Sequence, residues 1–298
     1  MAKPIDTRDF SYVRPINVHG EATRISADIL PATHNVQVFR VDNFTGGAAQ
    51  LFSANAPAAF GAGPGQRPSD PVLIDVAMQH IQNAASALGF QAGERAEFVP
   101  DPGVKDTSSG ERIVNAYQHY HGVPVFQMQR SVLLDRNGVV HSVTGSSVGV
   151  APQLNTTPMV PVEAAVKMAA EYVAQPDERT DAWTGKKIQR SGFDVSKFEP
   201  TVLGRIEIPC QPAVLDKGPF AEPIPAYLVV FYQGPTTRLG WHILIATENW
   251  TEQYVIVVAA DEQGAKSKEI LYGQKTSHDM RGTQGHVWEH NPLNRWPA

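Results

Sequence analysis

The stretch from residue 111 to residue 148 constrains the fold of this chain more than any other part of the sequence. It contains three segments in which apolar and polar residues alternate, over roughly 112–120, 123–134 and 139–148. Alternation with a period of two is the pattern of a strand that is buried on one face. The stretch therefore predicts three consecutive antiparallel strands, and the rest of the chain has to pack around them.

Two short turns connect these expected strands. His121-Gly122 separates the first strand from the second, and Asn137-Gly138 separates the second from the third. Asn-Gly tolerates positive φ at both positions, which a type I′ hairpin turn requires, so this turn type is predicted at 137–138. The residues of the second strand that are expected to share one face are Phe126, Met128, Val132 and Leu134.

A helix is predicted over 71–88, before this sheet. Ser69 or Asp70 can cap its N-terminus, and Pro71 suits the first helical position. Gly89 suits a left-handed exit from the helix. The residues that recur at helical spacing and form one apolar face are Leu73, Val76, Ala77, Ile81, Ala84 and Leu88. This face needs a sheet to cover it, and the predicted meander is the next one available.

The same order of elements occurs a second time. A helix is predicted over 161–173, and a short strand is expected near 202–208. Further strands are expected over 226–233, 241–247, 253–260 and 269–272. The order helix then meander, found twice, predicts an α+β fold built of two modules, each a helix packed on an antiparallel β-meander.

The ends of the chain are less regular. The segment 46–68 is dominated by Gly, Ala, Pro, Ser and Asn, which lose backbone entropy on ordering and offer little surface to bury. Short strands are possible at 23–30 and 35–41. The organisation expected is an extended arm and linker over 1–68, a first module over 69–150, a second over 151–275 and a C-terminal tail over 276–298.

Composition excludes several classes of function. The net charge is −5 and no run of Lys or Arg occurs, which argues against nucleic-acid or anionic-membrane binding. The single cysteine, Cys210, excludes an internal disulfide and is expected to be a small buried hydrophobe. The first twenty residues lack the apolar region of a secretory signal, and no stretch approaches about 18 apolar residues, so no membrane span is expected.

The histidines do not form a convincing catalytic group. His286-Val-Trp-Glu289-His290 spells the inverted zinc-protease motif, but Asn291-Pro292 follows directly and ends a helix there, so a chance match is expected. His119 and His121 alternate on a strand without a third ligand. His80 is expected to be packed beside the apolar face of its helix. No other hydrolase or nucleotide-binding motif occurs, so neither enzyme activity nor a cofactor is expected.

Several segments resemble the propeptide of fungalysin/thermolysin-type metalloproteases. The segment Tyr117-Gln-His-Tyr-His-Gly-Val-Pro-Val125 is similar to the family's aromatic-Gln strand followed by Gly-Val/Ile-Pro-Val. Val140-His-Ser-Val143-Thr-Gly145 is similar to its Val-x-Ser-Val-x-Gly strand. The strand Tyr254-Val-Ile-Val257-Val-Ala-Ala-Asp261 resembles the adjoining PepSY-like module. Gly285-His-Val-Trp-Glu-His-Asn-Pro292 is similar to the segment near the junction with the mature protease.

The resemblance covers about residues 70–273 and implies a cystatin-like or propeptide-like fold without a protease domain. It implies a non-enzymatic protein that inhibits a zinc metalloprotease or assists its folding, as an intramolecular chaperone in cis or as a separate protein in trans. It also implies an extracellular location, although no signal peptide is recognised. The tail residues expected to contact the partner are His286, Trp288, Glu289, Asn291 and Trp296.

Two other classes of function stay open. Long irregular ends on a compact core are also typical of an assembly subunit, whose arm at 1–68 and C-terminal tail connect copies or partners. Such a protein would be a homo-oligomer. The third class is a small metalloenzyme that uses His119, His121, His286 and His290, which metal analysis of the purified protein can test.

Overall fold

The computed structural model describes residues 4–14, 35–54, 68–91, 94, 96–180, 187–190, 192–247 and 252–276. Of these residues 41% lie in strands and 15% in helices, and fourteen strands are hydrogen-bonded into one mixed sheet. The expected α+β fold of two helix-on-meander modules is therefore wrong. The physical reason is a pairing that the strand pattern does not show, a parallel contact between β7 and β13 at Val125 and Val230.

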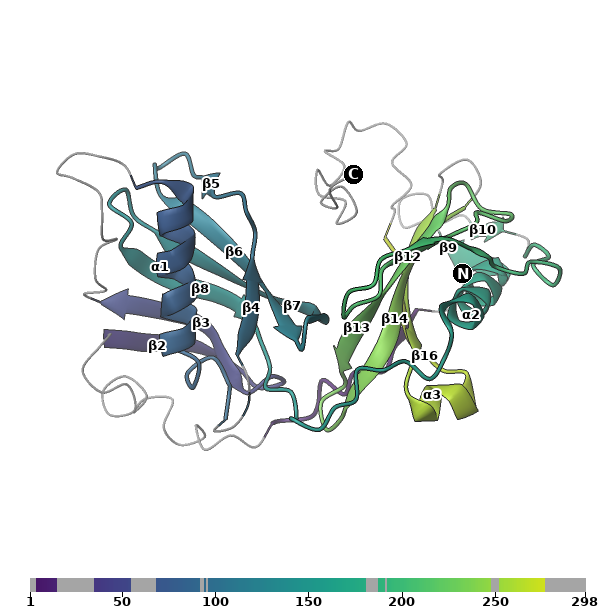
Figure 1. Cartoon of the computed structure of the whole chain (residues 1–298), viewed down its shortest axis with the longest axis horizontal. Helices are drawn as coiled ribbons and strands as arrows, with labels where there is room; N and C mark the ends of the chain where they lie inside the picture. Colours follow the sequence, from purple (N-terminus) through teal and green to yellow (C-terminus); the bar gives the residue numbers. More distant parts are fainter. Residues whose placement is uncertain are drawn as a thin grey trace.

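The sheet has two halves that meet at this contact (Figure 1). The first half-sheet and its helix consist of β2 (Asn35–Asp42), β3 (Gly47–Ala54), α1 (Asp70–Asn83), β4 (Glu97–Pro100), β5 (Lys105–Asp106), β6 (Arg112–Tyr120), β7 (Val123–Leu134) and β8 (Val140–Ser146). Its strand order is β2-β3-β8-β7-β6, with β4 and β5 both paired to β6. The bounds of β6 and β7 are those predicted from the sequence.

The second half-sheet is built mainly from the later part of the chain. Its elements are β1 (Ile5–Asp6), α2 (Val162–Ala174), β11 (Val202–Arg205), β12 (Ala213–Leu215), β13 (Ile224–Tyr232), β14 (Thr237–Ala246), β15 (Gln253–Ala259), α3 (Glu262–Ser267) and β16 (Ile270–Lys275). Its order is β1-β16-β15-β14-β13, with the β11–β12 ribbon paired to the far side of β13. A separate two-stranded sheet joins β9 (Asp177–Thr180) to β10 (Lys187–Arg190).

Each half-sheet has one helix on one face. Helix α1 buries Leu73 and Ile81 against Val132 and Leu134 of β7, in a core that contains only first-half residues. The helix follows Ser69 in extended conformation and has proline in its first turn, as predicted, although the serine side chain makes no capping hydrogen bond. In Figure 1 α1 lies in front of the first half-sheet and α2 on the side of the second half-sheet that faces away from the first.

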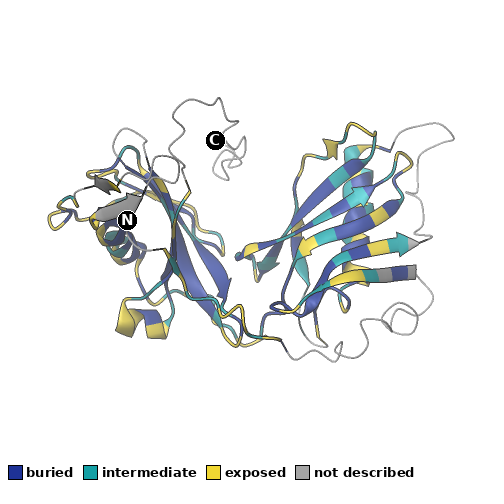
Figure 2. Ribbon diagram, turned by 180° about the vertical axis from the view of Figure 1, so that it is seen from behind, coloured by how far each residue is buried: buried dark blue, intermediate teal, exposed yellow. Residues whose placement is uncertain are grey.

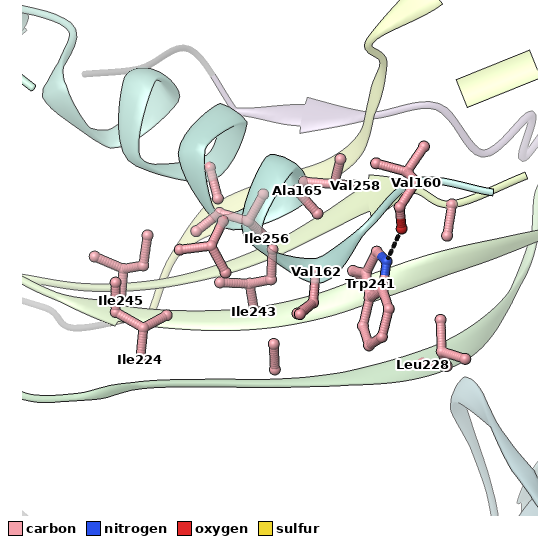
Figure 3. Packing of buried hydrophobic residues seen from close by; sticks show 14 of the residues in the cluster. Val160, Val162, Ala165, Ile224, Leu228, Trp241, Ile243, Ile245, Ile256 and Val258 are labelled. Carbon is pink, nitrogen blue, oxygen red and sulfur yellow. Dashed lines mark hydrogen bonds between the residues drawn. The ribbon is translucent and has the colours of Figure 1, made fainter. Parts of the chain in front are cut away.

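Trp241 anchors the core under α2 (Figure 3). Its side chain is fully buried among Val162, Ile243 and other aliphatic residues, and its indole N–H donates to the carbonyl oxygen of Val160 over 2.8 Å. A buried indole needs such a partner, because an unsatisfied donor costs about 1–3 kcal/mol. The bond therefore fixes the chain at the start of α2 on the sheet.

Strand β7 passes from one half-sheet to the other. It pairs with β6 on both sides of the bend and with β8 in its later part, and its earlier part also reaches β13 through Val125. The change occurs at Gln127, whose φ is 57°, a left-handed conformation that bends the strand. Opposite the bend, Tyr117 pairs with Gln129 whereas His119 pairs with Pro124, so β7 contains an insertion relative to β6. This bend lets one strand belong to both halves.

Part of the segment expected to be a linker is a strand. Residues 47–54 form β3, which pairs with β2 and with β8. The segment has low intrinsic strand propensity, and its pairing is supported by a buried arginine in β7. The guanidinium of Arg130 donates to the carbonyl oxygen of Ala48 over 2.5 Å and to that of Gly145 over 2.6 Å. Tertiary contacts therefore override the composition of this segment.

The turn at 137–138 differs from the expected type I′. Gly138 has a φ of 79°, but Asn137 is not among the residues with positive φ. The side chain of Asp135 accepts from the amides of Asn137 and Val139, each over 2.8 Å, and this favours a turn with a single left-handed residue. The pair with positive φ at both positions is His121-Gly122, at 50° and 76°.

Candidate interaction surfaces

The helices of the described residues leave one face of the first half-sheet uncovered, and we call it the open face. The cross-strand register places Ile113, Leu133, Ser142 and Phe52 in one row across four strands. Leu51, the neighbour of Phe52, points the other way into the core under α1. Residues directly opposite each other in a sheet point to the same side, so this row defines one surface. In Figure 2 the strands of this half-sheet lie in front of the helix.

Three large apolar side chains of the open face are exposed to solvent. Phe39 is 69% exposed, Phe52 is 40% exposed and Val99 is 47% exposed. The rings of Phe39 and Phe52 meet edge to face, with centroids 5.6 Å apart. Val99 pairs with Tyr117 at the other side of the half-sheet. Exposed aromatic pairs of this kind mark contact surfaces rather than core.

The centre of the open face is polar. The hydroxyl of Ser131 donates to the side-chain oxygen of Asn115 over 2.7 Å. Ser142, on the neighbouring strand, is buried between its neighbours. The exposed apolar side chains therefore lie at the two sides of the face, and polar groups together with the half-buried Leu133 lie between them. A partner on this face would contact two apolar areas and a line of hydrogen-bonding groups.

The corresponding face of the second half-sheet is covered. Phe126, from the bent part of β7, packs against Phe231 and Tyr272 with ring centroids 5.5 Å and 5.0 Å away. These three residues form a buried cluster with Val229, Val257, Ala259 and Leu271. The cluster lies on the face opposite α2. The half-sheet is thus buried on both faces, and the cover is supplied by β7.

His242 is the ionisable group at the centre of this covered face. It is 7% exposed, and its ring lies 4.6 Å from that of Tyr227, its partner in the β13–β14 register. Its Nδ1 has no hydrogen-bond partner. Burial lowers the pKa of His242 to about 4, so the ring is neutral at pH 7. A neutral ring stacked on aromatics contributes packing, and it is poorly suited to act as a base near neutral pH.

Burial also favours the neutral forms of Tyr227, which stacks on His242, and of Cys210, which lies near Tyr227. Burial raises the pKa of Tyr227, and the nearby thiol of Cys210 raises it further. Burial likewise raises the pKa of the Cys210 thiol, which is nearly inaccessible to solvent. The thiolate is the reactive form of cysteine, so this position does not favour a nucleophile. The expectation of Cys210 as a small buried residue agrees with this environment.

The segment 4–14, which we call the strap, crosses the same covered face. Ile5 and Asp6 pair with Gly273 and Tyr272 at the edge of β16. The guanidinium of Arg8 lies 5.4 Å from the centre of the Tyr272 ring and 6.0 Å from that of Phe231. These distances are those of cation–π contacts. The strap therefore adds to the cover that Phe126 of β7 provides over this part of the second half-sheet.

Three of the histidines singled out from the sequence, His80, His119 and His121, lie in the described part of the chain. His121 lies in the turn, and its positive φ breaks the alternation that would have placed it beside His119. Burial lowers the pKa of His119, whose Nδ1 lies 3.1 Å from the carbonyl oxygen of Tyr117. His80 is buried, with its Nε2 3.0 Å from the hydroxyl of Ser53. Among the described residues no three metal-ligating side chains cluster.

The expected tail residues cannot be placed. His286, Trp288, Glu289, Asn291 and Trp296 lie outside the described residues, as does His290. Within the described part, no helix is long and apolar enough to cross a lipid bilayer.

An open pocket of about 430 Å³ lies between the loop 151–159 and the turn that precedes β14. Its acidic wall is formed by Asp261 and Glu262. Both oxygens of Asp261 are already engaged by Arg238 over 2.7 Å, and one of them also accepts from the amide of Gly264. The carboxylate that could bind a ligand is thus used to hold α3 against β14.

Comparison with known proteins gives no match, either to a protein-family model or to a curated protein. The surfaces described above were not identified from the sequence. Phe126 was expected on the same face as Met128, but Phe126 packs in the cluster with Phe231 and Tyr272 whereas Met128 packs in the core under α2. Phe39 and Phe52 lie in segments where composition favoured an arm and linker. The alternation of Leu51 and Phe52 was the available signal, but it occurs in a stretch too rich in Gly and Ala to stand out.

Proposed function

We propose that this protein acts by binding another protein, and that it serves as an inhibitor or folding assistant of a zinc metalloprotease. The observation that carries the proposal is the exposed pair Phe39 and Phe52 on the open face. The identity of the partner class comes from the resemblance of segments such as 117–125 to metalloprotease propeptides.

The physical argument is one of burial. Aromatic side chains bury 150–250 Å² each when a partner covers them, and apolar burial contributes about 25 cal/mol per Å². A pair that is already in contact loses little side-chain entropy on binding, because each ring restricts the other. The polar groups of Ser131 and Asn115 can supply hydrogen bonds at the same surface. Aromatic anchors beside polar groups are the usual composition of a protein interface.

The C-terminal residues give this proposal its inhibitory step. An extended segment that lies in a protease cleft gains affinity from backbone hydrogen bonds, with Trp288 and Trp296 as side-chain anchors. His286 or Glu289 would then lie near the zinc of the partner. This part of the proposal rests on the sequence alone.

The test mixes the protein with a thermolysin-like protease and measures protease activity and refolding yield. We expect the unaltered protein to lower the activity or to raise the yield. The variant with Phe39→Ser and Phe52→Ser should lose most of this effect while keeping its circular dichroism spectrum. Leu203→Ser is the matched control, because Leu203 is 63% exposed but lies on β11, remote in the sheet order from the open face. An unaltered protein without effect on either quantity contradicts the proposal.

The alternative function, an assembly subunit, is favoured by a different surface. The β11–β12 ribbon exposes Leu203, Ile206 and Val214, and β11 is the outer strand of that ribbon. An exposed outer strand can pair with another chain. The outer strand β2, by contrast, has two irregularities in its register with β3, which make such pairing less favourable. Light scattering separates the two functions. Self-association that Leu203→Ser abolishes supports assembly, and a monomer at all concentrations counts against it.

A further inference from the structure

The strap is attached to the rest of the molecule through a few backbone bonds and through two arginines, Arg8 and Arg14. Its backbone contacts to the second half-sheet are the pairs of Ile5 and Asp6 with β16, a bond from Thr7 to Leu271 over 3.0 Å and one from Asp9 to Gln233 over 2.8 Å. By contrast, the side chain of Arg8 is only 14% exposed, a low value for an arginine. Arg14 pairs instead with Glu94 and with the carbonyl oxygen of Gly149, so Arg8 is the arginine through which the strap contacts the second half-sheet.

The site that holds Arg8 is built by three separate strands. Phe231 comes from β13, Tyr272 from β16 and Gln127 from the bend of β7. The Oε1 of Gln127 accepts from the guanidinium of Arg8 over 2.7 Å. The strap supplies the counter-charge, since both carboxylate oxygens of Asp6 accept from Arg8, over 2.8 Å and 2.6 Å.

The residues that bind Arg8 are held in position by parts of the molecule other than the strap. The aromatic rings are fixed by the buried cluster beneath them, in which Phe231 is completely inaccessible. The acceptor is fixed by the bent backbone at Gln127. The strap brings an internally paired Asp-x-Arg unit, in which the acid neutralises the arginine before it meets the rings. A paired guanidinium loses less hydration on binding than a free one, and it still stacks on aromatic faces.

We propose that the covered face of the second half-sheet is a binding site for an extended segment that carries an aliphatic residue, an aspartate and, two positions later, an arginine. In this structure residues 5–8 fill the site from within the chain. The occupant that replaces them is the same segment of a second copy. The inference does not depend on the proposed protease partner, because it concerns a different surface.

The length of the chain permits such an exchange. Twenty residues separate Arg14 from Asn35, and an extended chain of that length spans up to roughly 70 Å. The site and its ligand are the same in the exchanged form, so each copy recovers every contact it gives up. Exchange of an identical element between copies is a low-cost route to dimers.

The experiment uses the full-length chain and a fluorescent peptide with the sequence of residues 2–14. In the Arg8→Ala chain the internal ligand is weakened and the receptor residues are unchanged. We expect this chain to bind the peptide at least tenfold more tightly than the unaltered chain, as measured by fluorescence anisotropy. A peptide with alanine at the position of Arg8 should not bind. Gln127→Ala, added to the Arg8→Ala chain, should weaken binding severalfold.

Light scattering over a range of concentrations tests the occupant. The unaltered chain should form a dimer at high concentration, and Arg8→Ala should stay monomeric because its own strap is a poor ligand. The proposed site is wrong if both chains bind the peptide equally or if both peptides bind equally. It is also wrong if neither peptide binds. If the peptide binds but the unaltered chain forms no dimer, a second copy of the chain is not the occupant of the site. If Arg8→Ala does not fold, Asp6→Ala removes the counter-charge and serves in its place.

Discussion

The two half-sheets differ most on the faces that carry no helix. On the first, Phe52 and Phe39 are exposed and the centre is polar. On the second, Phe231 and Tyr272 are buried under Phe126 and the strap. Both faces contain aromatic residues on strands of similar length, so residue type alone does not decide burial. What decides it is whether another part of the chain reaches the face.

The difference arises from the bend in β7. The bend at Gln127 places Phe126 on the second half-sheet, although Val123 and Pro124 still pair with β6. The second half-sheet therefore gains a cover that the first one lacks. This asymmetry leaves a surface free for a partner on the first half, and it makes the second half the more completely buried of the two.

The largest expected effect is on stability, and it should differ between variants of Phe231 and Phe52. Phe231→Ala should lower the free energy of unfolding by about 3–5 kcal/mol, because it removes a fully buried ring and leaves a cavity. Phe52→Ala should lower it by less than about 1 kcal/mol, because its ring is partly in water already. Urea denaturation of both variants measures the difference. Equal losses would mean that the two faces are equivalent.

The second expected effect is a dependence of stability on pH, which arises from His242 on the covered face. The pKa of His242 is about 4 when folded and about 6.5 when unfolded, so between these values the unfolded chain binds the proton and the folded one does not. Stability should fall as pH is lowered from 6.5 to 4, by about 3 kcal/mol in total. His242→Phe keeps a stacked ring without the proton and should remove this part of the acid sensitivity. Denaturation of both proteins at several pH values measures this difference. If the stability of the two proteins changes with pH in the same way, the prediction is wrong.

The third effect tests the bend that creates the asymmetry. Gln127→Gly and Gln127→Ala both remove the side-chain bond to Arg8, but glycine accepts a φ of 57° without strain. The glycine variant should be more stable than the alanine variant by about 1 kcal/mol. Thermal or urea unfolding of the pair isolates the backbone contribution. If alanine is equally stable, the bend is not maintained at this residue.

The smallest effect on stability is expected on the open face. Phe39→Ser should change the free energy of unfolding by less than about 0.5 kcal/mol, since Phe39 is the most exposed large apolar residue in the described part of the chain. A loss of several kcal/mol would show that the ring has a structural role. A small change in stability, together with a large change in partner binding, would sharpen the contrast between the two faces.

Much of the secondary structure follows from the sequence. The bounds of β6 and β7 were predicted because apolar alternation and a two-residue turn agree there. Helices α1 and α2 were predicted within a few residues from their apolar spacing, whereas the short helix α3 was not predicted. These are local properties, and local patterns suffice to find them.

The arrangement of these elements did not follow from the sequence, because it depends on contacts between distant residues. Val125 and Val230 are ordinary strand residues, and nothing in their surroundings indicates that they pair. The left-handed conformation at Gln127 has no signal such as glycine or asparagine. The open face was missed because Phe52 lies in a segment whose strand conformation is imposed by β8 and by Arg130. The predicted residues of the C-terminal tail remain untested.

The pairing of β1 with β16 has a consequence for synthesis of the protein. Thr7 and Leu271 are bonded although their positions are 264 residues apart in the sequence. At the usual rates of translation the strap waits on the order of 10–50 s before its edge strand exists. The first half-sheet, complete once Ser146 has left the ribosome, can fold during this interval. The nascent chain is therefore expected to carry one finished half-sheet, which Arg14 can already contact through Glu94, while residues 5–8 lack their edge strand until β16 emerges.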